Sequence, residues 1–93
     1  MDPSWLTEKA TLQEIEAENT PDAATRARDP RLPDKPFAFG NDRWEALKSK
    51  MQEGDELWYF CSPPESWQHL AGRAGIAIVR AGQIVDSFVT QMN

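Results

Sequence analysis

The only thiol and the only imidazole of this 93-residue chain, Cys61 and His69, are eight positions apart with Pro63 and Pro64 between them. A thiol beside an imidazole is the minimum for nucleophilic catalysis, because the base must hold the thiolate. The double-proline corner allows a contact, but no third residue at a recognisable spacing would orient the imidazole. A lone cysteine on an apolar strand is more often a small buried side chain. A cysteine-dependent enzyme is therefore our third hypothesis.

A second candidate site is the segment 66–75, which places Trp67, His69 and Arg73 between the proline corner and two glycines. A guanidinium and neighbouring backbone N–H groups can bind a carboxylate or a phosphate. The spacing is not that of a P-loop or a dinucleotide fingerprint. The segment indicates either a small-molecule or anion-binding module, our second hypothesis, or a turn in which Arg73 pairs with an acidic residue of the same chain.

Four tryptophans are many for so short a chain, and indole rings supply both core volume and interface contacts. Trp44 has the spacing of a core residue. Trp58 shares its predicted strand face with Glu56 and Ser62, so we expect it to be partly exposed and available to a partner. Our leading hypothesis is a non-enzymatic protein-interaction or regulatory module that acts through Trp58, Trp67, Arg73 and their neighbours, on a protein partner or on itself.

The composition argues against several classes of function. The net charge of −5 disfavours nucleic acid as a partner, since binding to phosphates relies on clustered Lys and Arg. The charge is uneven: residues 1–22 carry six acids and one base, whereas residues 26–43 carry five bases and three acids. The longest apolar run, Leu57–Cys61, is too short to span a membrane. We expect a cytoplasmic protein without a metal or another cofactor.

The first forty residues predict two segments. Residues 1–20 contain a thin apolar stripe, which predicts an amphipathic N-terminal helix over 4–19 with Ser4 as its N-cap. Residues 21–40 carry four prolines among alternating charges, which predicts an extended linker. Such a helix is only marginally stable alone, so we expect it to dock on the rest of the chain or on a partner.

The remaining residues, 41–93, predict a small α+β core. Asp42 and Glu45 have the spacing of a capping box before a helix over about 43–52. Residues 56–62 predict a strand, and 76–80 with 83–90 predict a hairpin whose turn is either a two-residue turn or a G1 bulge. The expected fold is a three-stranded, mostly antiparallel sheet with one or two helices on one side. A core this small needs extra burial, and a homodimer paired at a sheet edge is one source of it.

Four short motifs lie in the part of the chain after Trp44: Gly54–Trp58 (GDELW), Ser62–Trp67 (SPPESW), Leu70–Gly75 (LAGRAG) and Val79–Gly82 (VRAG). In these motifs the chain resembles a group of short bacterial proteins for which no activity is established. The resemblance covers a little over half of the chain. It implies a bacterial, cytoplasmic, free-standing domain, and it transfers no catalytic residue.

Overall fold

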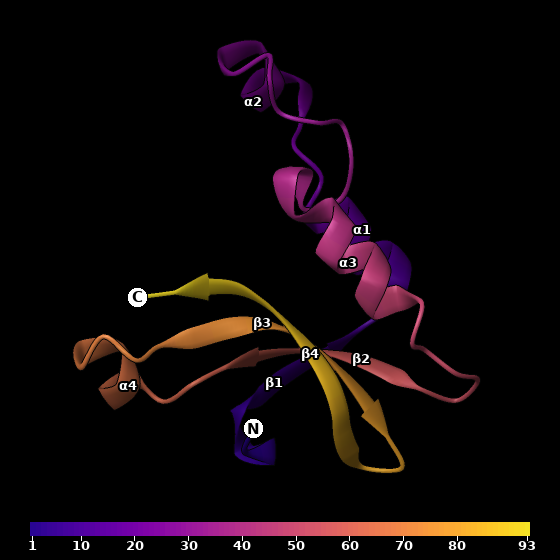
Figure 1. Ribbon diagram of the computed structural model, residues 1–93, viewed down its shortest axis with the longest axis vertical. Helices are drawn as coiled ribbons and strands as arrows, with labels where there is room; N and C mark the ends of the chain where they lie inside the picture. Colours follow the sequence, from indigo (N-terminus) through magenta and orange to yellow (C-terminus); the bar gives the residue numbers. More distant parts are fainter.

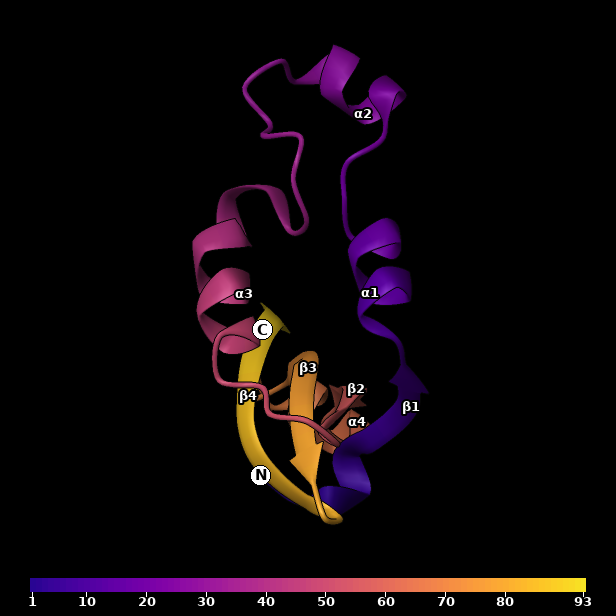
Figure 2. The ribbon, with the colours of Figure 1, turned by 90° about the vertical axis from the view of Figure 1, so that its right-hand side faces the viewer.

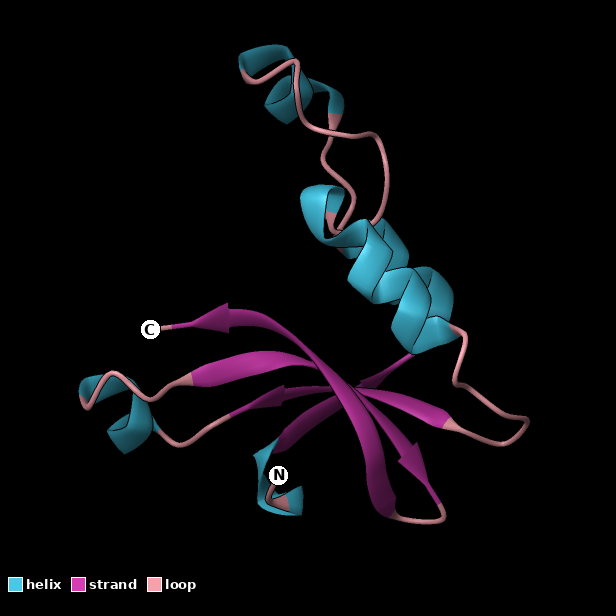
Figure 3. Cartoon of the chain, in the orientation of Figure 1, coloured by secondary structure: helices cyan, strands magenta, loops and turns pink.

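The computed structural model describes residues 1–93 and is organised around an antiparallel sheet of four strands in the order β1-β2-β3-β4. The elements in chain order are η1 (Pro3–Trp5), β1 (Leu6–Ala10), α1 (Leu12–Glu18), α2 (Ala23–Arg28), η2 (Ala38–Gly40), α3 (Asn41–Lys48), β2 (Glu56–Cys61), α4 (Pro64–Gln68), β3 (Arg73–Arg80) and β4 (Gln83–Met92). Helices α1 and α3 lie over one face of the sheet (Figure 1, Figure 3). The predicted α+β class is confirmed, but the sheet has four strands rather than three.

The additional strand is β1, in a region where the sequence predicted the first turns of a helix starting at Ser4. It pairs antiparallel with β2, with a register shift near Thr7. The helix begins later, after Thr11, because the Thr11 hydroxyl accepts the backbone N–H of Glu14 while the Glu14 carboxylate accepts that of Thr11. This reciprocal capping satisfies two N–H groups that would otherwise be unpaired, so it fixes the start of α1.

The helix α3 confirms that a helix precedes β2, but it spans Asn41–Lys48 and starts earlier than predicted. Its N-cap is Gly40, which makes no side-chain capping bond, and the predicted capping box of Asp42 and Glu45 does not form. The turn η2 leads directly into α3, and the backbone N–H of Asn41 bonds to a carbonyl of that turn. Backbone groups therefore supply the cap that side chains were expected to supply.

The hydrophobic core lies between the two helices and the sheet. Its buried members are Ile15 of α1, Trp44 and Leu47 of α3, and Leu57, Ile76, Ile78 and Phe88 of the strands. Leu57 and Tyr59 face this core from β2, as the alternation of the strand predicted. Aromatic contacts extend the core to Phe37, whose ring lies 5.0 Å from the rings of both Trp44 and Phe88.

The predicted hairpin forms from β3 and β4, and Arg80 pairs with Gln83 across its turn. Ala81 and Gly82 both have positive φ, 51° and 79°. This is the pattern of a two-residue type I′ turn, which matches the twist of the paired strands. Of the two turns that the sequence left open, the tight one is present.

A buried ion pair closes the end of the sheet nearest this turn. Asp55 precedes β2 and holds the guanidinium of Arg80 with two hydrogen bonds, Oδ1 to Nε at 2.8 Å and Oδ2 to Nη2 at 2.9 Å. The backbone N–H of Gln52 donates to the same carboxylate at 2.8 Å. The Asp55 side chain is 1% exposed. The Arg80 bonds, followed by the Gln52 bond, lower the pKa of Asp55 from 3.8 to about 2.

The segment between α1 and α3 projects away from the sheet (Figure 1, Figure 2). The sequence predicted an extended linker here, but the segment contains the short helix α2. The side chain of Asp22 caps this helix by accepting the backbone N–H of Thr25 at 2.7 Å. We refer to residues 21–35 as the arm. None of the helices in the chain is long and apolar enough to cross a membrane.

Candidate functional site

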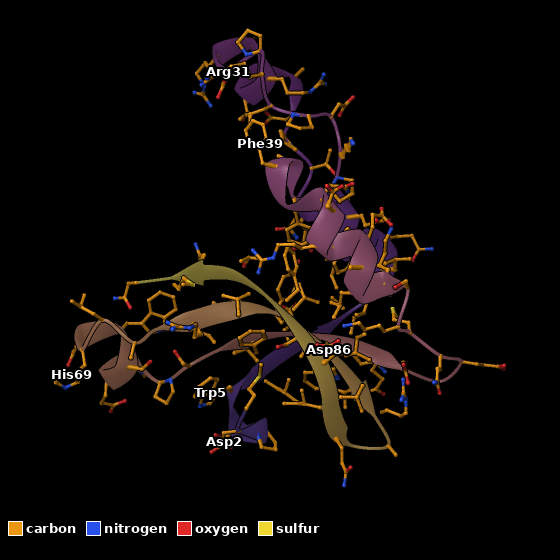
Figure 4. All side chains as sticks on the ribbon, viewed as in Figure 1. Asp2, Trp5, Arg31, Phe39, His69 and Asp86 are labelled. Carbon is orange, nitrogen blue, oxygen red and sulfur yellow. The ribbon has the colours of Figure 1, made fainter.

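The face of the sheet turned away from α1 and α3 is apolar, although no long helix covers it. Cross-strand pairing places eight apolar residues of the four strands on this side: Leu6, Trp58, Phe60, Ala77, Val79, Ile84, Val89 and Met92. We call this set the open face. The short turn η1 lies on the same side and brings Trp5 to it (Figure 4). An antiparallel sheet with one face in water normally carries polar residues on that face, so the open face departs from the usual pattern.

The open face has a buried floor and a more accessible margin. Phe60, Ala77 and Val79 are 2%, 0% and 5% exposed. Trp58 and Ile84 are half-buried, as are Leu6 and Val89. The accessible apolar area therefore lies in a ring around the centre of the sheet, and Trp58 supplies its largest side chain.

The indole of Trp58 is held in place by a short chain of polar contacts. Its Nε1 donates to Glu56 Oε1 at 3.0 Å, and Lys9 Nζ lies 3.0 Å from Glu56 Oε2. The bond from Trp58, followed by the bond from Lys9, lowers the pKa of Glu56. A ring fixed in this way loses little rotamer freedom when another surface packs on it, which favours tight contact.

Side chains of the same protein bond two backbone groups of the edge strand β4. Arg43 Nη2 of α3 donates to the carbonyl of Val89 at 3.3 Å, and Asp86 Oδ1 accepts the backbone N–H of Ser87 at 2.8 Å. Lys50 in turn holds Asp86 at 2.6 Å. Edge strands of natural proteins are commonly protected so that no other chain adds to them. The edge-to-edge homodimer that the sequence suggested as an option stays a prediction.

The corner between β2 and β3 uses its polar groups internally. Ser62 is 3% exposed, and its backbone N–H donates to Arg73 O at 2.8 Å while Arg73 N–H donates to Ser62 Oγ at 2.9 Å. The Ser62 hydroxyl also lies 2.6 Å from that of Ser66. The guanidinium of Arg73 turns back on its own backbone, where Nη1 donates to Gly72 O at 2.8 Å. Arg73 forms no ion pair with an acidic residue.

Trp67 is packed into this corner rather than extended from it. Its Nε1 donates to Ser62 O at 3.2 Å, and its ring lies so close to Gly72 that a Cβ there would be 2.2 Å from Trp67 Cδ2. Asn93 closes the corner, because its side chain accepts Gly72 N–H at 2.8 Å and donates to Trp67 O. The glycine is required by the close approach of the indole.

The structure does not join the thiol and the imidazole. His69 is exposed at the end of α4, where it is visible at the margin of the molecule (Figure 4). Cys61 is exposed at the end of β2, and no hydrogen bond connects it to His69. Next to His69, Leu70 has a φ of 59° and is 77% exposed, an uncommon conformation for a branched side chain.

A hollow of about 400 Å³ lies on the helix-covered side of the sheet, where α1 ends; we call it the trough. Seven residues line it: Asn19, Tyr59, Phe60, Ala74, Gly75, Thr90 and Gln91. Tyr59 donates its hydroxyl to Glu18 Oε2 at 3.0 Å and accepts from Asn19 Nδ2 at 3.2 Å. Burial, followed by the charge of Glu18, raises the pKa of Tyr59.

Two other hollows are present, of about 340 Å³ beside Lys9 and Asp55, and about 160 Å³ between α3 and β4. Trp67, His69 and Arg73 line none of the three hollows. No group of three or more His, Cys, Asp or Glu residues is arranged to hold a metal ion. The candidate residues of segment 66–75 therefore form a corner of the fold and do not surround a cavity.

Sequence reasoning singled out Trp58 but did not place Trp5 and Leu6 on the same side of the sheet, because both were assigned to a helix. The available signal was the capping pattern at Thr11 and Glu14, which would have freed the preceding residues to form a strand. It also missed the trough, because the lining residues come from distant parts of the chain and no local pattern connects them.

Fold and site together define the class of this protein, an α+β domain with one helix-covered and one open apolar sheet face. Comparison of the chain with protein-family models, with curated proteins and with solved structures found no match. The function is therefore inferred from the residues and their arrangement.

Proposed function

We propose that the protein is a non-enzymatic interaction module whose open face binds an amphipathic helix of a partner protein. One observation supports this most: both faces of the sheet are apolar, but helices cover only one of them. Apolar sheet faces are stable when a second layer of helices or strands packs on them. A helix from a partner would supply on the open face what α1 and α3 supply on the other.

The charges around the open face favour an apolar stripe with a mixed polar border. No member of the open face is charged. Lys9, Glu56 and Arg73 lie at its margin, on strand positions that face the same way. An amphipathic helix offers matching chemistry, with apolar side chains along one face and charges on both sides of it.

Trp58 is the residue that we propose to contribute most to binding. Tryptophan is enriched among the residues that dominate interface energies, and these residues lie near the centre of an interface. The contact with Glu56 fixes the indole before a partner arrives. On the strength of the resemblance to short bacterial proteins, we propose a bacterial cytoplasm as the setting.

The two alternatives have less support from the geometry. Gly72 O takes one of the five N–H donors of Arg73, but Trp67, His69 and Arg73 line no hollow that would enclose an anion. A screen of anionic metabolites that raised the melting temperature would favour this alternative. Cysteine catalysis would need Cys61 and His69 to approach each other, and rapid reaction of Cys61 with a thiol reagent near neutral pH would favour it.

The proposal can be tested by NMR with an 18-residue peptide of leucine, lysine and glutamine that forms an amphipathic helix, and with its scrambled sequence as a control. We expect the amphipathic peptide to shift the backbone amide signals of the open face, centred on Trp58 and Ala77. The scrambled peptide should leave them unchanged. Equal shifts with both peptides, or shifts confined to the helix-covered side, would contradict the proposal.

A further inference from the structure

The arm makes its hydrogen bonds and ion pairs within itself. Arg26 Nη1 lies 3.7 Å from Asp34 Oδ2, and Arg31 Nε lies 3.3 Å from Asp29 Oδ1. No hydrogen bond or ion pair connects residues 21–35 to the strands or to α3. Arg31 lies near the far end of the arm, well away from the sheet (Figure 4). The arm is thus a projecting element that the rest of the chain leaves uncovered.

The base of the arm is fixed firmly. Phe37 N–H donates to Asn19 O at 2.7 Å, and the buried Asn41 donates from Nδ2 to Pro36 O at 3.0 Å. Phe37 and Ala38 both have positive φ, 63° and 47°, a costly conformation that the packing of the Phe37 ring offsets. The arm therefore leaves the body in a set direction, and its two ends are adjacent.

The projecting arm gives the protein more surface than a compact chain of its mass. The radius of gyration is 14.1 Å, whereas a compact domain of this length has about 12 Å. The accessible surface is 6092 Å², against roughly 5,400 Å² for a compact monomer of this mass.

The arm is also the basic part of an acidic protein. It carries four basic and three acidic residues, so the rest of a chain of net charge −5 carries −6. Arg28 and Lys35 are exposed and have no acidic partner. The trough, by contrast, is bordered by the exposed acids Glu18 and Glu8. The free positive charges of the arm and the acidic border of the trough are therefore complementary.

We propose that the arm of a second copy of this chain fills the trough, in a reciprocal exchange that forms a two-fold symmetric dimer. The trough begins at Asn19, the residue from which the arm emerges. Two arms lying antiparallel about a two-fold axis would each place its tip at the base of the other, so one contact would satisfy both copies. Arg28 of one copy would then face Glu18 of the other.

This dimer does not depend on the open face. Asn19 and Tyr59 of the trough lie on the side of α1 and α3, and the open face, which shares only the buried Phe60 with the trough, lies on the opposite side of the sheet. Each protomer of the dimer would keep its open face available. Failure of one proposal therefore leaves the other standing.

The first test is the molar mass in solution of the intact chain and of a variant in which residues 21–35 are replaced by a short Gly-Ser turn. The adjacency of Asn19 and Phe37 allows this shortening without disturbing α1 or α3. We expect a molar mass of twice 10.5 kDa for the intact chain and the mass of a single chain for the variant. The β-sheet signal in circular dichroism should be the same for both proteins. An intact chain that is monomeric, or a shortened chain that is still dimeric, would overturn the proposal.

The second test changes the charge of the arm by a substitution that leaves the fold intact. Arg28→Gln should raise the dimer dissociation constant about tenfold or more, because a charge pair is lost at each of the two symmetric contacts. Gln68→Glu changes the net charge equally at an exposed position away from the arm and should leave dissociation within about twofold. Equal weakening by both variants would show general repulsion between acidic chains and would overturn the proposed contact.

Discussion

Trp44 donates its indole N–H to Glu16 Oε2 across 2.9 Å, which ties the fully buried ring of α3 to the carboxylate of α1. Lys48 Nζ binds the same oxygen at 2.8 Å. The bond from Lys48, followed by the bond from Trp44, lowers the pKa of Glu16. Because α1 is only seven residues long, it depends on such contacts: this one ties it to α3, whereas the burial of Ile15 and the bonds that link Glu18 and Asn19 to Tyr59 hold it on the sheet.

The first prediction concerns this contact. Glu16→Ala leaves the buried N–H of Trp44 without an acceptor, so it should lower the free energy of unfolding by about 1–3 kcal/mol. Glu45→Ala removes only the more exposed partner of Lys48, and should cost less than about 1 kcal/mol. Urea denaturation of both variants measures the difference. Equal losses of unfolding free energy would show that Glu16 stabilises the fold through Lys48 and not through the bond from Trp44.

The second prediction follows from the lowered pKa of Asp55. Its pKa is about 2 in the folded protein and 3.8 as the ordinary value. The carboxylate is ionised in both states above pH 3.8, so its contribution is complete there and is lost as the pH falls from 3.8 towards 2. The stability advantage of the wild type over Asp55→Asn should therefore shrink between pH 5 and pH 2.

Urea denaturation at several pH values tests this dependence. Glu53→Gln is the control, because Glu53 is exposed and makes no hydrogen bond through its side chain. The difference between wild type and this control should stay constant over the same range. A constant difference for Asp55→Asn as well would mean that the pair with Arg80 does not form in solution.

The third prediction concerns the corner between β2 and β3. Gly72→Ala places a Cβ about where the Trp67 ring lies, 2.2 Å from Cδ2, so the indole must move. Overpacking of this kind costs about 1–3 kcal/mol. Ala71→Ser, at the exposed neighbouring position, should have little effect. Thermal unfolding followed by tryptophan fluorescence would report both effects, and an unchanged melting temperature for Gly72→Ala would contradict the packing.

Local signals predicted the elements that depend on local chemistry. The prolines after Cys61 end β2, and the Ala81-Gly82 pair turns the hairpin, because both act through the backbone of adjacent residues. The alternation in β2 also predicted that neither face of the strand is cleanly polar. That observation anticipated the open face, although it did not identify which residues on other strands complete it.

The features that the sequence did not predict depend on contacts between residues far apart in the chain. Leu6–Ala10 becomes a strand by pairing with the edge of β2, and the local signal, the capping pattern at Thr11 and Glu14, indicates only that the helix starts later. The capping box predicted from Asp42 and Glu45 does not form, because backbone groups of the turn before α3 cap the helix. The trough and the contact of Glu16 with Trp44 join residues far apart in the chain, so neither could be derived from spacing.

The most direct test of the proposed function is the affinity of the amphipathic peptide for three proteins: the wild type, Val89→Glu and Thr90→Glu. Val89 belongs to the open face, whereas Thr90 faces the helix-covered side, where its hydroxyl contacts Ala74 O at 3.3 Å. The two variants carry the same charge change at adjacent positions of β4. We expect Val89→Glu to weaken binding tenfold or more, about 1.4 kcal/mol, and Thr90→Glu to leave it nearly unchanged. Equal affinities of all three proteins would contradict the account.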